Sequence, residues 1–172
     1  MKTKVKKRTW IALLNLLFLF TAVNAQPVRQ YLHEGWNFRQ ARGTNWYAAT
    51  VPGTVHTDLM DNKLIDDPFY RLNERGVQWV DKEDWIYRTT FDVTPELLAK
   101  KNIVLHFEGL DTYADVTLNG KKILSADNMF CKWQADVRSL LKEHGNELQV
   151  YLHSPIKIAM PKWEAVPFQY RS

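Results

Sequence analysis

Acidic side chains that lie close together are the first candidates for chemistry, because hydrolysis of a glycosidic bond needs a pair of carboxylates. Three groups of neighbouring acids occur: Asp66 with Asp67, Asp81 with Glu83 or Asp84, and Asp111 with Asp115. Adjacent acids in turns are most often solvent-exposed or cap helices. None of the groups has a sequence context that places it in a pocket. We therefore assign no catalytic residue within this chain.

Other reactive residue types are scattered along the chain. No two histidines stand at i, i+4 spacing, so the sequence predicts no metal site. No Gly-x-Ser-x-Gly segment occurs, and Cys131 has no base beside it, so a nucleophilic triad has no support. A glycine-rich phosphate loop is also absent from the sequence. We expect no cofactor.

One long segment combines aromatic and polar residues without the period of a helix or a strand. It runs from Phe69 to Trp85 and includes Tyr70, Asn73 and Trp79. Long loops in compact domains are usually functional or docked against another surface. Tyr70 or Trp79 could lie over the face of a sugar or contact another domain. Equally, these rings could cover the open end of the fold, and the residues alone leave both interpretations open.

The first 25 residues are predicted to be a secretory signal peptide. Basic residues up to Arg8 precede an apolar run from Trp10 to Phe20, and the small residue Ala25 marks a cleavage site. We expect export through a cleavable signal to the periplasm or the outside of the cell. An uncleaved signal anchor is the alternative. No later segment is long and apolar enough to cross a membrane.

Charge and cysteine content limit the remaining classes of protein. Without residues 1–25 the chain holds 18 Lys and Arg against 19 Asp and Glu, a net charge of −1. Because there is no basic stripe to hold phosphates, we expect no nucleic-acid partner. The single cysteine excludes an internal disulfide. Residues 26–172 suit one domain that is stabilised by its hydrophobic core.

The elements that must position these residues are mostly short strands. The best-defined pair is a hairpin in which Ala114, Val116 and Leu118 alternate with polar residues. Asn119 and Gly120 supply the two positive φ angles that a type I′ turn requires. Alternation and turn residues predict further strands at residues 35–40, 44–50, 84–93, 102–108, 130–135 and 147–153.

Helical segments are predicted to be few and short. Thr54 caps a helix that Asp66-Asp67-Pro68 stops, and Thr94-Pro95 begins a helix of one turn. Residues 137–143 form a further helical turn. In the tail, three prolines interrupt the chain and the apolar residues form no regular stripe. The pattern predicts an all-β fold, an antiparallel β-sandwich of jelly-roll type with a few short helical turns.

Four segments carry a resemblance to a known family. They are Val51-Pro52-Gly53-Thr54, Asp67-Pro68-Phe69-Tyr70-Arg71-Leu72-Asn73-Glu74, Asp84-Trp85-Ile86-Tyr87 and Gly109-Leu110-Asp111-Thr112-Tyr113-Ala114. Together they resemble the N-terminal sugar-binding, galactose-binding-like domain of family 2 glycoside hydrolases. The second and fourth segments favour the exo-acting β-mannosidase branch. The resemblance covers residues 26–172, which we expect to be this domain, truncated at its C-terminal end.

The resemblance implies an enzyme whose catalytic residues lie outside this chain. In that family the two catalytic glutamates belong to a later TIM-barrel domain. The full-length protein would be a secreted retaining exo-β-mannosidase that hydrolyses terminal non-reducing β-D-mannose residues, while this chain alone would be inactive. Its partners would be β-mannosides or mannose-containing oligosaccharides, together with the C-terminal domains of the same polypeptide.

The resemblance also implies a role for the aromatic and polar loop, which would face the barrel and shape the active-site entrance. The candidate site residues are accordingly Asp67, Tyr70, Asn73, Glu74 and Trp79. Asn73-Glu74 matches the Asn-Glu of the family's acid/base motif only superficially, because it lies in a loop of the first domain. Two alternatives stay open: a free-standing carbohydrate-binding or adhesion module, and the same domain of a β-galactosidase-type or β-glucuronidase-type enzyme.

Overall fold

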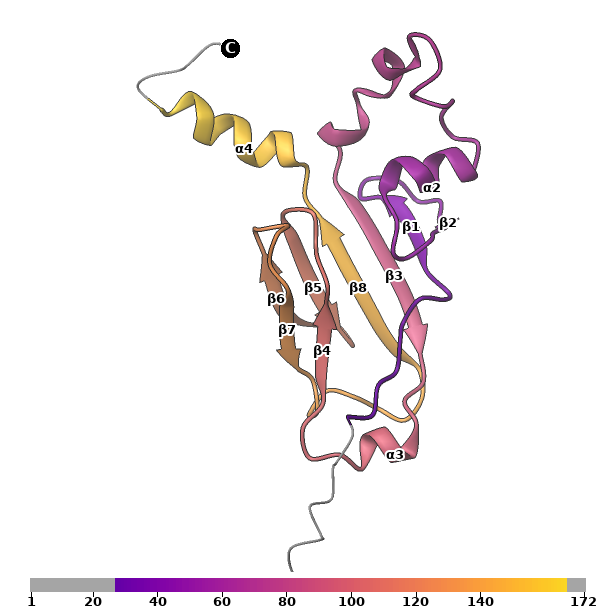
Figure 1. The fold of residues 1–172 in the computed structure, drawn as a ribbon, viewed down its shortest axis with the longest axis vertical. Helices are drawn as coiled ribbons and strands as arrows, with labels where there is room; N and C mark the ends of the chain where they lie inside the picture. The colour runs from indigo at the N-terminus through magenta and orange to yellow at the C-terminus, as the bar shows by residue number, and fades with distance from the viewer. Residues whose placement is uncertain (1–26, 167–172) are drawn as a thin grey trace, which may run out of the picture. The chain divides into compact units, whose positions relative to one another are not determined.

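Two antiparallel sheets and a few short helices make up the described part of the chain, residues 27–166 of this computed structural model (Figure 1). The chain divides into two compact units, residues 1–30 and 31–172, and every element named below belongs to the second. The predicted signal peptide lies outside the described residues. Among the described helices, none is both long and apolar enough to cross a bilayer.

The larger sheet has six strands in the order β2-β1-β3-β8-β5-β6, and the smaller pairs β4 with β7. All neighbours are antiparallel, which confirms the predicted sandwich class. The strand bounds are Asn37–Gln40 (β1), Tyr47–Ala48 (β2), Trp85–Phe91 (β3), Val104–Phe107 (β4), Ala114–Leu118 (β5), Lys121–Ala126 (β6), Trp133–Asp136 (β7) and Asn146–Leu152 (β8).

The core lies between the two sheets and follows the period-2 pattern of the strands. On β5 every second residue is buried, as the alternation predicts. Phe38 on β1 and Leu148 on β8 are fully buried beside them, and Leu105 of the smaller sheet packs against this cluster. The predicted hairpin turn is also confirmed, since Asn119 and Gly120 have φ angles of 52° and 78°.

The helical elements are α2 (Val55–Asp61), the 3₁₀ helices η1 (Asn73–Val77) and η2 (Val80–Lys82), α3 (Pro95–Leu98) and α4 (Pro155–Glu164). Thr54 caps α2 as predicted, through a capping box with Thr57. The predicted stop at residues 66–68 is wrong. The helix ends at Asp61 because Lys63 adopts a left-handed φ of 58° and its N–H bonds back to Met60.

The tail also differs from its prediction. Pro155 starts the ten-residue helix α4, because a proline is tolerated at the first helical position, where Ser154 caps the helix. Pro161 lies inside α4 and removes one N–H, yet the helix continues to Glu164. The predicted helical turn at residues 137–143 is a single hydrogen-bonded turn, in which the N–H groups of Leu140 and Leu141 both donate to Val137.

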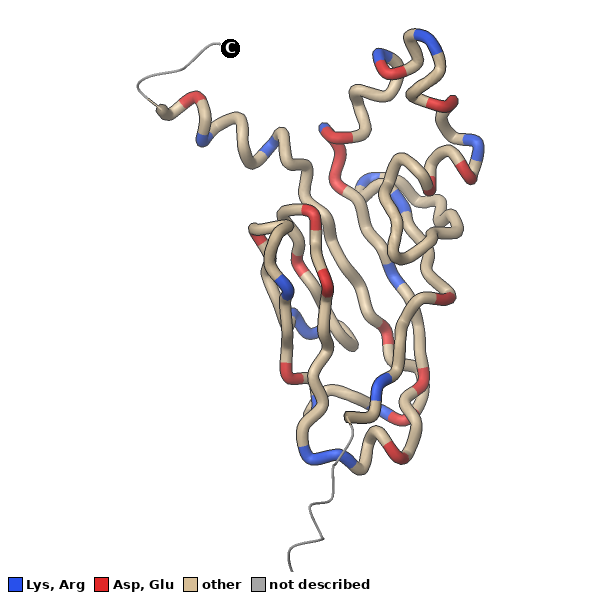
Figure 2. Tube along the Cα trace, in the orientation of Figure 1, with Lys and Arg blue, Asp and Glu red and all other residues tan. Residues whose placement is uncertain are grey.

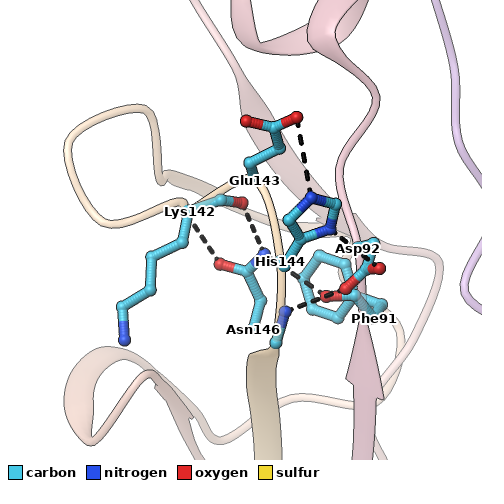
Figure 3. Close-up of polar contacts among 7 residues, drawn as sticks. Phe91, Asp92, Lys142, Glu143, His144 and Asn146 are labelled. Carbon is cyan, nitrogen blue, oxygen red and sulfur yellow. Dashed lines mark hydrogen bonds and ion pairs between the residues drawn. The ribbon is translucent and has the colours of Figure 1, made fainter.

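Asn146, at the start of β8, is a buried polar residue whose side chain bonds to three segments, and Figure 3 shows its contacts with Phe91 and Lys142. Its Nδ2 donates to the carbonyl oxygens of Lys142 and Phe91, at 2.7 and 3.3 Å. Its Oδ1 accepts from the Lys142 N–H and from Asn119 Nδ2, at 2.8 and 3.0 Å. The side chain thus joins the end of β3, the β5–β6 turn and the segment before β8.

Replacing this side chain should destabilise the fold. Asn146→Ala would leave several buried polar groups without partners, and we expect it to lower the free energy of unfolding by about 3 kcal/mol. The exposed Asn102 provides the control, and Asn102→Ala should change the value by less than about 0.5 kcal/mol. Urea unfolding measures both variants. Equal stabilities of the two would contradict the role given to Asn146.

Candidate functional site

The segment from Lys63 to Trp79 connects α2 to η2 and lies at the end of the larger sheet where β3 begins (Figure 1). It contains a closed turn from residue 67 to residue 73. The Asp67 carboxylate accepts the N–H of Phe69 at 2.9 Å, and the Asp67 carbonyl accepts from Asn73 Nδ2 at 3.0 Å. Arg71 adopts a left-handed φ of 54° inside this turn. Side-chain hydrogen bonds therefore fix the shape of this turn, which precedes the 3₁₀ helix η1.

An open hollow of about 310 Å³ lies beside this turn. Residues 63–66 line one side, and the other side is formed by Asn73, Gly76, Val77 and Trp79. The Trp79 ring is 39% exposed and lies 5.9 Å from the ring of Trp85, whose Nε1 donates to the Val80 carbonyl. The lining thus includes the Trp79 ring, the charged residues Lys63 and Asp66, and Asn73, whose amide nitrogen already donates to Asp67.

Two of the five predicted site residues line the hollow and three do not. Asn73 and Trp79 line the hollow. Asp67 closes the turn, whereas Tyr70 and Glu74 lie outside the hollow, exposed to solvent. The prediction missed the lining side chains of residues 63–65, because it continued α2 through them. The signal that could have placed them is Asn62-Lys63, since asparagine commonly precedes or forms the left-handed end of a helix.

A buried carboxylate anchors the helix that leads into this segment. Asp58 of α2 is 1% exposed, and its Oδ1 accepts the Thr50 N–H at 2.8 Å. Its Oδ2 accepts the hydroxyl of Tyr87, on β3, at 2.7 Å. Burial, followed by the nearby Asp58 carboxylate, raises the pKa of Tyr87, so the hydroxyl stays protonated and keeps donating.

The close backbone contact beside this anchor requires glycine. A Cβ atom on Gly53 would lie 2.3 Å from the carbonyl oxygen of Thr50, so any side chain at Gly53 would displace the backbone. Thr50 is the same residue whose N–H bonds to Asp58. The close contact thus lies immediately before Thr54, the residue that caps α2.

The neighbouring acids do not assemble into a catalytic pair. A hydrogen bond from Lys122 lowers the pKa of Asp115 to about 2, and Ser125 and His153 also contact this carboxylate. Burial opposes ionisation of Asp84, but hydrogen bonds led by the Ser154 N–H lower its pKa overall. Both groups stay ionised at neutral pH, so neither can act as a general acid.

Charge is mixed over the described chain, and Figure 2 shows basic and acidic residues interleaved in the segment that borders the hollow. The electrostatic potential at the hollow is therefore not dominated by charges of one sign. Asp66 is the one acidic residue that lines the hollow. Within residues 27–166, no three metal-ligating side chains come close enough to hold an ion.

Comparisons with known proteins agree with this architecture. The chain is 44% identical over 126 residues to β-mannosidase B of Thermothelomyces thermophilus, covering 72% of this chain and 15% of that protein. It is 42% identical to β-mannosidase B of Emericella nidulans, over 66% of this chain and 14% of that protein. The chain thus spans about 15% of the length of the relatives that it matches.

Solved structures of glycoside hydrolases are also similar to this chain. The structure of a β-D-mannosidase from Dictyoglomus thermophilum superimposes with a TM-score of 0.78 and 48% identity, over 81% of this chain and 17% of that one. An exo-chitosanase from Amycolatopsis orientalis shares the fold alone, with a TM-score of 0.59 and 22% identity over 69% of this chain and 16% of that one. The model of the glycosyl hydrolase 2 galactose-binding domain-like family matches residues 36–172. The chain therefore belongs to the glycosyl hydrolase 2 galactose-binding domain-like family.

Proposed function

We propose that this chain is the non-catalytic β-sandwich domain of a retaining exo-β-mannosidase that removes terminal non-reducing β-D-mannose residues. The observation that carries the proposal is the 48% identity, at a TM-score of 0.78, to the Dictyoglomus β-D-mannosidase. A second observation supports the non-catalytic role. The hollow holds a single carboxylate, whereas retaining glycoside hydrolysis needs two about 5 Å apart.

In this proposal the segment from residue 63 to residue 79 faces the catalytic domain and shapes the entrance to the active site. Asn73 and Trp79 are the side chains that we expect to contact a β-mannoside, and their position in the lining of the hollow supports this role. Asp67 holds the turn that carries Asn73 and acts as a positioning residue. Glu74 has no catalytic role, since its side chain lies outside the hollow.

We also propose that the enzyme is exported from the cytoplasm. A signal peptide at residues 1–25 would direct the enzyme to the periplasm or to the outside of the cell, where β-mannosides of the surroundings are accessible. The basic residues and apolar run of that segment support it. N-terminal sequencing of the secreted protein tests it, and a mature chain that does not begin at Gln26 would contradict cleavage after Ala25.

Activity measurements test the proposed function. The full-length enzyme should release nitrophenol from 4-nitrophenyl β-mannoside, and the 172-residue chain alone should release none. Turnover by the 172-residue chain would contradict the non-catalytic role. A full-length protein that cleaves only the corresponding β-galactoside or β-glucuronide would contradict the β-mannosidase assignment.

The role of the hollow is tested in the full-length enzyme. Trp79→Ala should lower kcat/KM for β-mannosides about tenfold, mainly through a higher KM, because it removes a ring from the substrate entrance. Trp79→Phe, which keeps an aromatic ring against Trp85, should retain most of the activity. Tyr31→Ala is the matched control, since Tyr31 is 68% exposed and lies outside the hollow. An unchanged kcat/KM for Trp79→Ala would contradict this role.

A further inference from the structure

Two phenylalanine rings stand out as the most exposed large apolar side chains among the described residues. Phe69 is 94% exposed and Phe130 is 88% exposed, and Met129 beside the latter is 43% exposed. Exposure of a whole aromatic ring is unfavourable in water, so rings displayed in this way commonly mark a surface that another molecule covers. Phe69 belongs to the segment discussed above, whereas Met129 and Phe130 lie in the β6–β7 loop, residues 127–132, to which no function has been given.

The β6–β7 loop is held in one conformation by its own polar groups. The Phe130 N–H donates to Asn128 Oδ1 at 2.9 Å, and Trp133 Nε1 donates to the Asn128 carbonyl at 3.1 Å. Lys132 forms an ion pair of 2.7 Å with Glu108, which ties the loop to the end of β4. The exposed ring is therefore presented by an ordered turn, which lowers the entropy lost when a partner binds it.

Phe69 is held by a matching hydrogen bond in its own loop. There the Asp67 carboxylate accepts the Phe69 N–H, also at 2.9 Å, so each ring follows an Asp or Asn side chain by two residues. The two loops also lie at the same end of the sandwich (Figure 1). In the sheet register, Ala126 at the end of β6 aligns through Ala114 and Leu152 with Trp85 at the start of β3. A single body that approaches this end can therefore meet both rings.

The chemistry around Phe130 favours a protein surface over a sugar. A sugar site needs polar groups that converge on the ligand. Here the Asn128 carbonyl and amide oxygen, Lys132 and Glu108 are already engaged within the fold. The large apolar groups that this loop offers a partner are the Phe130 ring and the flexible Met129 thioether, the kind of anchor that inserts into a pocket at a protein interface.

The position of α4 indicates which protein surface this is. Helix α4 departs from the same end of the sandwich, after Ser154, and it is the last described element of the chain. A domain that follows this one in a longer enzyme is therefore tethered at the end that displays both rings. The tether gives that domain a high effective concentration at the two loops.

We propose that Met129 and Phe130 form a second apolar contact with the catalytic domain of the full-length enzyme, separate from the contact at residues 63–79. The inference rests on the proposed function only in assuming that such a domain follows. Together, the two rings would fix the orientation of the sandwich at two separated points, so that the hollow keeps a constant position relative to the active site.

Hydroxyl-radical footprinting of the full-length enzyme tests this contact, because the oxidation rate of a side chain, divided by the intrinsic reactivity of its residue type, reports its exposure; all rates below are normalised in this way. Met129 and Phe130 should be oxidised several-fold more slowly than Tyr31, the exposed aromatic control in the same molecule. Oxidation of Phe130 at the rate of Tyr31 would overturn the proposal. If Phe69 alone were protected, the entrance role of residues 63–79 would stand while the second contact failed.

Footprinting with an added sugar distinguishes a protein contact at Phe130 from a sugar-binding role of the same ring. The protection of Phe130 should be the same with and without a manno-oligosaccharide, since the partner is part of the polypeptide. A Phe130 ring that is oxidised freely until the sugar is added would overturn the proposal in favour of a sugar-stacking platform. Footprinting does not depend on turnover, so an enzyme that lacked mannosidase activity would still give a decisive result.

A variant provides an independent check in the full-length enzyme. Phe130→Ser should lower the thermal unfolding midpoint, because the contact with the catalytic domain loses its apolar ring. Tyr31→Ser should leave the midpoint unchanged, because Tyr31 is exposed and the segment before β1 begins at the opposite end of the sandwich (Figure 1). Equal midpoints for the parent and Phe130→Ser would overturn the proposal.

Discussion

The hydrogen bond between Tyr87 and Asp58 is the interaction on which the candidate site depends. Tyr87 lies on β3 and packs against Phe38, with ring centroids 5.5 Å apart, so its hydroxyl is fixed by the core. Asp58 brings a carboxylate into the same interior without a cationic partner, and such a group is tolerated only while it is hydrogen-bonded. This pair ties α2 to β3, and with it the start of the segment from residue 63.

Much of the sheet could be predicted from the sequence because period-2 alternation directly reports which face of a strand is buried. Asn119-Gly120 predicted the hairpin turn and Thr54 predicted the start of α2, since each feature requires a specific backbone conformation. The predictions were wrong where the local sequence pattern and the tertiary contacts favour different backbone conformations. The end of α2 depends on the left-handed Lys63, and α4 tolerates Pro161, neither of which residue type alone discloses.

The candidate site was predictable as a segment and only partly as a set of side chains. Composition and family resemblance both indicated the loop around Tyr70 and Trp79. Which of its residues line the hollow could not be predicted, because the turn from residue 67 to residue 73 is closed by side-chain hydrogen bonds, which have no sequence period. Asp58 was missed for a related reason: a polar residue on a short helix usually faces solvent, and its burial is explained by two distant partners, the Thr50 N–H and the Tyr87 hydroxyl.

The most direct test of this account is hydrogen exchange of the Tyr87→Phe variant, followed by mass spectrometry. The substitution keeps the ring but removes the hydroxyl, leaving Asp58 Oδ2 buried without its partner. Exchange should accelerate in peptides that cover residues 50–79, while peptides from β5 and β8 should exchange as in the parent protein. Unchanged exchange in residues 50–79, or equal acceleration throughout the sandwich, would contradict the claim that this hydrogen bond positions the site.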